Sequence, residues 1–307
     1  MKHLFKYTLL AATAIAAFVN SSCDKVSQPT IILTTLDTTI YPGNFVEYEV
    51  PTFEPNTNTD RNILIEDYTG HRCGACPGAA IIAHDLELAN PGRVFVASIH
   101  AGPSNNGITD FQKTIDPYYT RDFTTPEGLE MGSSFFQLGV GFVGNPRGTI
   151  NRIAEESGAF MFNQGQWADK TNAALSTTLQ VNIQAKSNYF PETNGTYLHI
   201  ETEFLDDLEG EYNITAYVIQ KKIVAYQYIN GTGDVPDYEH HNVHIGNVFN
   251  ETWGRSVASG TITAGTKVYT DMSYTLPDGL TNEDLLFQIY VYDRNSYEIL
   301  QVIEHDF

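Results

Sequence analysis

Residues 63–77 read ILIEDYTGHRCGACP, and this stretch decides the fold of the first half of the chain. Its first three residues are a short apolar run, which is typical of a buried strand. Residues 79–89 carry helix formers with apolar side chains at helical spacing, and Asn-Pro-Gly at 90–92 ends that helix. Residues 94–99 form a second apolar run. The pattern predicts a βαβ unit, in which a right-handed crossover joins two parallel strands.

The Cys-x-x-Cys pair, Cys73 and Cys76, lies between the predicted strand and the predicted helix. A helix N-terminus presents unpaired N–H groups and partial positive charge, which stabilise a thiolate and lower its pKa. We expect Cys73 to be the exposed, attacking sulfur. Cys76 is then the resolving sulfur, because two intervening residues allow it to attack a mixed disulfide at Cys73.

These residues resemble the active site of the thioredoxin superfamily, whose Cys pair has the same spacing at the same strand-to-helix junction. The resemblance implies that Asp67 is the buried acid that moves protons near the resolving cysteine. It also implies that Pro146 is the cis-proline that faces the Cys pair, and X-Pro is the one peptide bond for which cis is cheap. Two features depart from the superfamily: Arg72 replaces a usual Trp, and the segment 101–131 is an insertion without sustained periodicity.

From residue 178 onward the sequence changes to short β-rich runs separated by turn residues such as Asn194-Gly195. The seven runs cover residues 179–183, 197–204, 212–220, 243–248, 267–274, 285–292 and 299–303. Short strands with regular turns and no helical period predict an antiparallel sandwich. The predicted fold is therefore an α/β thioredoxin-like domain followed by an all-β, immunoglobulin-like sandwich domain.

The N-terminus has the pattern of an export signal: a charged start, an apolar run at about 9–19, and small residues before Cys23. This arrangement resembles a bacterial lipobox, in which the cysteine is acylated and becomes the new N-terminus, although Asn20 replaces the usual Leu. The alternative is an ordinary secreted protein cut near Ser22. The predicted organisation is a signal peptide at 1–22, a lipidated tether at 23–61 with one strand around 40–50, a thioredoxin-like domain at 62–177 that ends in a helix at 164–179, and a β-sandwich at 178–307.

The chain is strongly acidic, with 17 basic and 37 acidic residues and a formal charge of −20. Removal of residues 1–22 takes away Lys2 and Lys6 and no acid, which gives −22. Such a surface repels phosphate backbones, and the sequence has no Lys/Arg cluster, so we expect no nucleic-acid partner. We expect no cofactor and no metal ion, and the sequence does not determine an oligomeric state.

A second resemblance covers most of the exported chain. The runs at 63–77, 145–152, 238–243, 291–293 and 298–301 resemble the outer-membrane-protein-28-related lipoproteins of Bacteroidetes-type bacteria. That resemblance implies a thioredoxin-like domain and a β-rich domain on an outer-membrane lipid anchor at Cys23, without an established activity. Asp24, by contrast, favours retention at the inner membrane under one sorting code.

Two functions remain open at this level. The first is an enzyme for thiol–disulfide exchange that acts on thiols or disulfides of exported proteins, and the second is a non-enzymatic surface lipoprotein, a binding or adhesion module with a structural disulfide. A zinc half-site at the Cys pair would need further ligands, for which His71, His84 and His100 are available. The densest histidine cluster, His240, His241 and His244, is either a metal site or an ordinary polar loop.

Overall fold

A computed structural model describes residues 30–34, 36–249 and 251–307 of the chain. The signal peptide at 1–22 and the lipidation site Cys23 lie outside these residues, so both stay predictions. None of the helices in the described ranges is both long enough and apolar enough to cross a membrane.

The βαβ unit predicted from the sequence is confirmed. Strand β2 (Ile63–Tyr68) leads through the Cys loop into helix α2 (Cys76–Ala89), and strand β3 (Val94–Ile99) returns beside β2. The two strands pair in parallel from Ile63 opposite Val94 to Tyr68 opposite Ile99. Strand β4 (Arg147–Ile150) then pairs with the other edge of β2 in the antiparallel sense.

The segment between β3 and β4 is not only a loop, because helix α3 (Pro126–Leu138) begins inside the predicted insertion. The Thr125 side chain caps this helix by accepting a hydrogen bond from the Gly128 N–H, and Gly139 ends it in the left-handed conformation. The helix expected at 164–179 is shorter, a 3-10 turn η2 (Gln164–Gln166) followed by α4 (Trp167–Ala174).

The remainder of the chain is β-rich, and each of the seven predicted runs overlaps a strand. The strands are β5 (Val181–Phe190), β6 (Gly195–Phe204), β7 (Leu208–Ile229), β8 (Gly233–Asn247), β9 (Arg255–Ile262), β10 (Lys267–Thr275), β11 (Leu285–Asp293) and β12 (Ile299–His305). The sequence reasoning missed β9. The strand expected around 40–50 is wrong, since that segment contains only the 3-10 turn η1 (Phe45–Glu47), and β1 (Thr30–Thr34) lies earlier.

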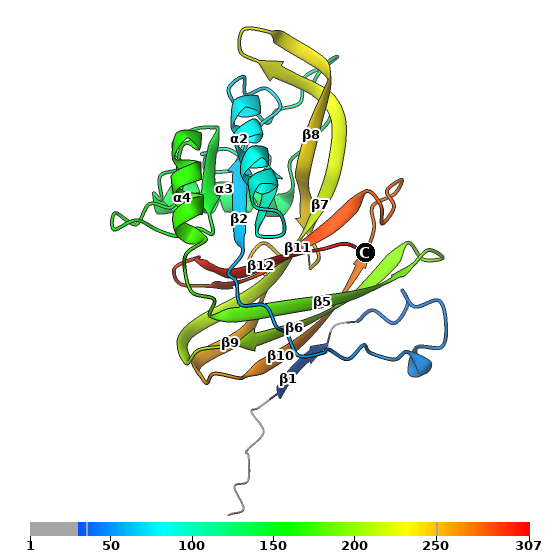
Figure 1. Cartoon of the computed structure of the whole chain (residues 1–307). Coiled ribbons are helices and arrows are strands. Elements are labelled where there is room, and N and C mark those ends of the chain that lie inside the picture. The colour runs from blue at the N-terminus through cyan, green and yellow to red at the C-terminus, as the bar shows by residue number, and fades with distance from the viewer. Residues whose placement is uncertain (1–29, 35, 250) are drawn as a thin grey trace, which may run out of the picture.

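The strands form one antiparallel-dominated sheet and one mixed sheet (Figure 1). The smaller sheet has the order β1-β10-β6-β5, and the larger has the order β12-β11-β7-β8-β3-β2-β4 with β9 paired to β7. The larger sheet crosses residue 178, because β3 pairs with β8 at Ser98 opposite Val243. The protein is therefore mostly β, with strands from both halves of the chain in one sheet.

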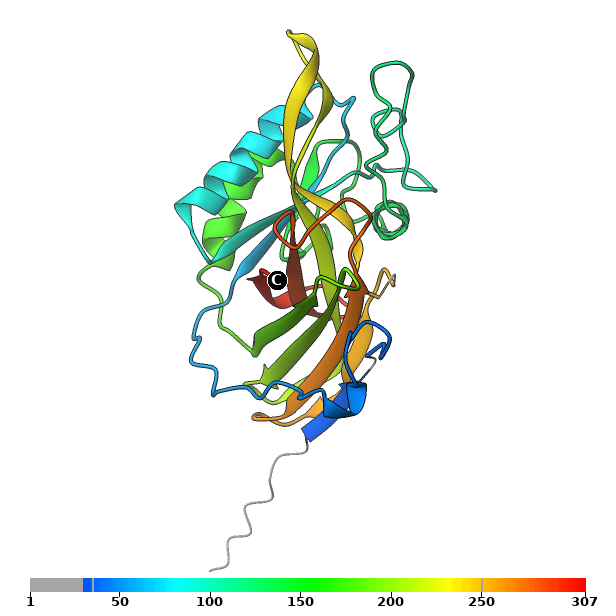
Figure 2. The ribbon, with the colours of Figure 1, turned by 90° about the vertical axis from the view of Figure 1, so that its right-hand side faces the viewer.

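Alternation along β7 explains why this strand is buried on both faces. Ile214, Ala216 and Val218 belong to the core against the four-stranded sheet, whereas Tyr217 and Ile219 belong to the core shared with β2, β3 and α3. A third core lies between β2, β3 and β4 on one side and helices α2 and α4 on the other. Figure 2 shows the helices beside the upper part of the larger sheet, with the four-stranded sheet below.

A buried ion pair joins these cores. Arg152, just after β4, donates to both carboxylate oxygens of Glu66 on β2, at 2.6 and 2.8 Å, and both side chains are fully buried. The same guanidinium donates to the hydroxyl oxygens of Tyr217 on β7 and Tyr290 on β11 at 2.9 and 3.0 Å. Arg152 therefore connects the βαβ unit directly to the β-rich half.

We predict that Glu66→Gln lowers the free energy of unfolding by about 3–5 kcal/mol, because it leaves the buried Arg152 charge without a counter-ion. Urea unfolding measures the change. The matched control is Lys113→Ala, which breaks the exposed Lys113–Asp110 pair and should cost at most about 1 kcal/mol. An equal loss of unfolding free energy in the two variants would show that the buried pair contributes no more to stability than an exposed one.

Candidate functional site

The Cys loop is a tight turn at the start of α2. The Cys73 N–H donates to the Gly70 carbonyl at 2.9 Å, and the Cys76 N–H donates to the Cys73 carbonyl at 3.1 Å. Cys73 precedes the helix, and Cys76 is its first residue. The two sulfurs form a disulfide, with 5.4 Å between their Cα atoms.

The expectation that Cys73 is exposed is wrong for this disulfide-bonded state. Cys73 and Cys76 are each only 1% exposed. The cover comes from the far half of the sequence, because the Gln227 side chain, on β7, donates to the Cys73 carbonyl at 3.1 Å. The position of the Cys loop between a strand and a helix could be predicted from the neighbouring sequence. The element that covers the loop could not, because it is remote in the sequence.

Asp67 and Cys76 line one cavity of about 160 Å³ at the carboxyl ends of β2 and β3. Asp67 is 1% exposed, and its Oδ1 atom has no hydrogen-bond partner among the described residues. Burial without a compensating charge raises the pKa of Asp67 to about 8. A buried carboxyl that titrates close to neutral pH can accept a proton as the carboxylate and return it as the acid, in the cavity that Cys76 borders.

A cluster of three histidines and aromatic rings lies beside this cavity. His100 stacks on Phe123 with ring centroids 4.4 Å apart, and its ring centroid lies 5.9 Å from that of His240 and 6.3 Å from that of His71. Neither ring nitrogen of His100 has a hydrogen-bond partner among the described residues. Burial lowers the pKa of His100 well below its usual value and that of His240 to about 4, so these rings are neutral at pH 7.

The sequence cluster of His240, His241 and His244 is separated by the fold. His240 lies in the buried cluster and His241 is exposed beside Glu239, while the buried His244 contacts the Thr125 hydroxyl at 3.1 Å. No group of three or more potential metal ligands was found in residues 30–34, 36–249 and 251–307. The histidine motif is thus not a single site.

Pro146 follows a cis peptide bond from Asn145. The Asn145 amide donates to the carbonyls of Tyr68 and Ala101, at 2.8 and 2.9 Å, which fixes this turn against the ends of β2 and β3. Pro146 is outside the set of residues that line the cavity with Asp67 and Cys76. Of the four predicted site residues, the structure thus places Cys73, Cys76 and Asp67 together, with Pro146 on the neighbouring turn.

Sequence reasoning named His100 only as an available zinc ligand beside the Cys pair, and it missed Tyr238 and Gln227 as residues of this site. For His100 a signal existed, because it directly follows β3, and the carboxyl ends of adjacent parallel strands meet at one edge of a sheet. Gln227 and Tyr238 come from the β7–β8 hairpin, whose position over the Cys loop has no local signal.

The fold and the site define a mostly β protein with a mixed sheet and a buried Cys-x-x-Cys disulfide. The family model for outer membrane protein Omp28 matches residues 136–306, and the chain belongs to this family. Family membership associates the chain with the cell envelope. No curated protein gave a match.

Two solved structures from Porphyromonas gingivalis are similar. HBP35 has 18% sequence identity and a TM-score of 0.59, over 82% of this chain and 76% of that chain. A domain of the outer membrane lipoprotein Omp28 has 15% identity and a TM-score of 0.28, over 41% of this chain and 87% of that chain. At this identity the likeness to HBP35 shows the fold alone.

The raised pKa of Asp67 gives a testable pH dependence. Between about pH 4 and pH 8 the folded protein keeps a proton that the unfolded chain has released, so this group's contribution to stability is lost as pH rises. Asp67→Asn removes the effect. The stability of the variant relative to the wild type should rise by up to about 1.4 kcal/mol per pH unit across this window and then level off. Urea unfolding of the oxidised proteins tests this, and a constant difference from pH 4 to 8 would contradict the assignment.

Proposed function

We propose that this protein is a lipid-anchored thiol–disulfide oxidoreductase of the cell envelope, with a thioredoxin-like domain at 62–177 and an immunoglobulin-like sandwich at 178–307. The observation that carries the proposal is the disulfide at the start of α2, in the same cavity as the buried acid Asp67, whose Oδ1 atom has no hydrogen-bond partner in the described part of the chain. The lipid at Cys23 would hold this site at the outer membrane. The substrates would be thiols or disulfides of exported proteins.

The exchange is a pair of substitutions at sulfur. The Cys73 thiolate attacks a substrate disulfide, which gives a mixed disulfide and one substrate thiolate. The Cys76 thiol gives its proton to the Asp67 carboxylate and attacks Cys73, so the second substrate sulfur leaves as a thiolate and the Cys73–Cys76 pair is oxidised. Asp67 returns its proton to one substrate thiolate, and water protonates the other. In reverse, the same steps oxidise a substrate dithiol and leave the pair reduced.

The roles of the two cysteines give distinct outcomes on substitution. Cys73→Ser should abolish exchange with a disulfide-bonded polypeptide, because it removes the attacking sulfur. Cys76→Ser should instead accumulate mixed disulfides, because it removes the resolving sulfur. Non-reducing gels and mass spectrometry distinguish the two. Wild-type exchange no faster than that of a free thiol would exclude the enzyme.

A structural disulfide in a non-enzymatic binding module is the second candidate, and the 1% exposure of both cysteines favours it. The reduction potential separates the two functions. For an exchange catalyst we expect a value between about −270 and −120 mV, whereas a value below about −300 mV marks a structural disulfide. Equilibration of the purified protein in graded thiol buffers measures it.

A further inference from the structure

The ends of β7 and β8 form a two-stranded hairpin that reaches the Cys loop (Figure 1). The Tyr228 N–H donates to the His71 carbonyl at 2.9 Å, and the Asn230 N–H donates to the Gly74 carbonyl at 3.0 Å. With the Gln227 amide on the Cys73 carbonyl, hairpin donors engage three carbonyls in and around the Cys-x-x-Cys turn.

The hairpin and the Cys loop are in close contact at Gly74. A Cβ atom added to Gly74 would lie 2.1 Å from Oδ1 of Asn230 and 2.9 Å from the Tyr228 ring. Real Cβ atoms do not approach other atoms so closely, so a side chain here would force the Asn230 and Tyr228 side chains to move. The hairpin therefore lies directly on the loop that contains Cys73, and this cover explains why the cysteine is buried.

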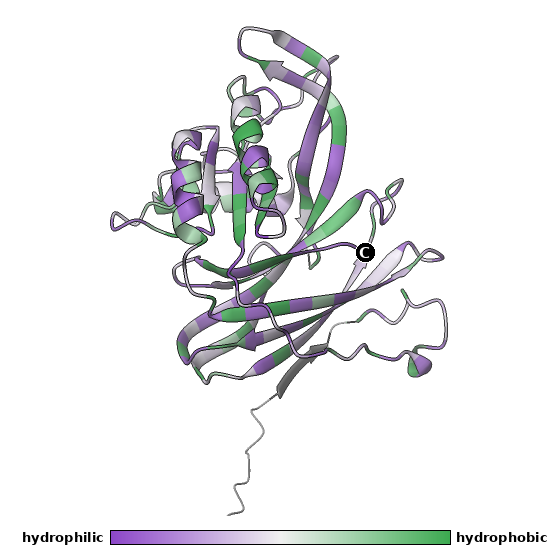
Figure 3. Cartoon of the chain, viewed as in Figure 1, coloured by the Kyte–Doolittle hydropathy of each residue, from purple (hydrophilic) through white to green (hydrophobic). Residues whose placement is uncertain are grey.

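Little of the main sheet supports this part of the hairpin. Strand β8 pairs with β3 only at Ser98 opposite Val243, and from Lys222 to Ile229 the hairpin strands pair with each other. Figure 3 shows hydrophilic and hydrophobic residues mixed along the hairpin. Isolated two-stranded hairpins are marginally stable, and such segments open at a lower free-energy cost than the whole fold.

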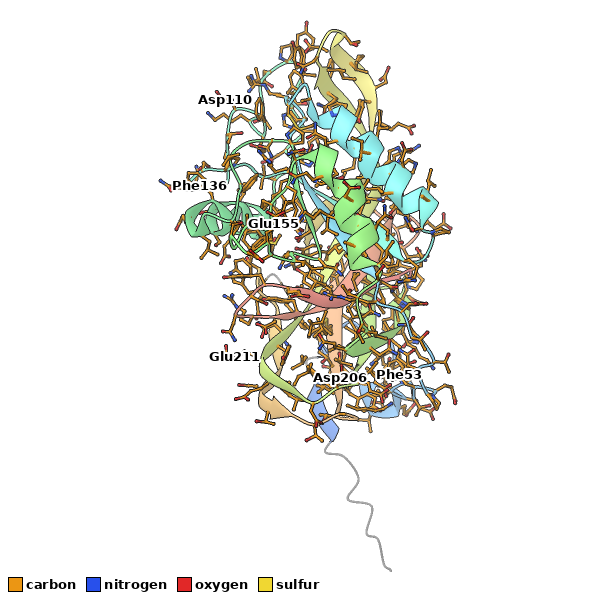
Figure 4. All side chains as sticks on the ribbon, turned by 60° about the vertical axis from the view of Figure 1, so that its left-hand side comes forward. Phe53, Asp110, Phe136, Glu155, Asp206 and Glu211 are labelled. Atoms are coloured by element: carbon orange, nitrogen blue, oxygen red, sulfur yellow. A yellow bond between two sulfur atoms is a disulfide. The ribbon has the colours of Figure 1, made fainter. Side chains whose placement is uncertain are left out.

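The insertion holds the hairpin from its other side. The Tyr119 hydroxyl donates to the Asp234 carboxylate, and the Tyr118 ring lies 5.3 Å from the Tyr226 ring. Figure 4 places Asp110, in the same insertion, at the end of the molecule where the hairpin lies, opposite Phe53 and Asp206. Side-chain contacts of this kind can separate without unfolding either core.

We propose that the β7–β8 hairpin is a lid that excludes thiols from the Cys73–Cys76 disulfide until it opens. This inference rests on the proposed exchange function for its role in the cell. Because the lid engages backbone carbonyls through N–H donors, the natural competitor for its place is an extended polypeptide segment, which carries the same donors.

The lid can be removed without changing the Cys loop. A variant in which Asn-Gly replaces residues 227–236 keeps the Ala225–Tyr238 pair and closes the shortened hairpin with a two-residue turn. The measured quantities are the rate constants with which dithiothreitol and an unfolded polypeptide with one cysteine attack the disulfide, followed by alkylation and mass spectrometry. We expect both rates to rise by about tenfold or more, because three hydrogen bonds that close the lid are lost.

If the shortened chain does not fold, a point variant tests whether the hairpin limits attack on the disulfide. Gln227→Ala deletes the bond to the Cys73 carbonyl, together with a bond to the Tyr228 carbonyl inside the hairpin, and both rates should rise by about threefold to tenfold. Thr232→Ala is the matched control, since this exposed residue at the hairpin turn makes its backbone bond to Ile229 and not to the Cys loop. Its rates should equal those of the wild type.

Each outcome separates the lid from the proposed function. Wild-type rates in a folded lid-removed variant, or in Gln227→Ala, would overturn the lid and leave the cysteine-substitution results untouched. Faster attack by dithiothreitol together with no exchange on any polypeptide would support the lid and exclude the oxidoreductase.

Discussion

The interaction on which the rest of the structure depends is the buried Glu66–Arg152 pair. Two charges removed from water are stabilised only when each finds a partner and further hydrogen bonds, and here Tyr217 and Tyr290 supply those bonds. The pair also lowers the pKa of Glu66, so the carboxylate stays ionised in a core. The two charged residues come from β2 and the end of β4, and the two tyrosines come from β7 and β11. Together they fix the βαβ unit against the β-rich half.

The alternation of side chains along β2 places the ion pair on one face of the sheet and the candidate site on the other. Glu66 and Asp67 are neighbours in β2, so their side chains point to opposite faces of the sheet. Glu66 meets Arg152 on one face and its pKa falls, whereas Asp67 meets the α2 side without a cation and its pKa rises to about 8. Two adjacent acids thus have opposite properties, one structural and one suited to proton transfer, because of the face each occupies.

The sequence allowed prediction of what is encoded locally. Apolar runs and helix formers placed β2, α2 and β3 at nearly their observed residues, and the Cys loop followed from them. Helix α3 was missed although Thr125 and Pro126 are start signals, because the Gly- and Asn-rich sequence before them shows no period. The β3–β8 pair joins residues far apart in sequence, and no local pattern reports such a contact. The burial of Cys73 was missed for the same reason.

The burial of Cys73 determines how the Cys pair can react. A Cys-x-x-Cys turn at a helix start has the groups needed for exchange, but the sulfur of a cysteine that is only 1% exposed cannot be attacked in this conformation. Any reaction at Cys73 therefore requires a prior opening, and the end of the hairpin over it is held by a few hydrogen bonds and by ring contacts with the insertion. The rate of exchange is then set by the opening of the hairpin as well as by thiol chemistry, since attack on a buried disulfide is limited by the population of the open state.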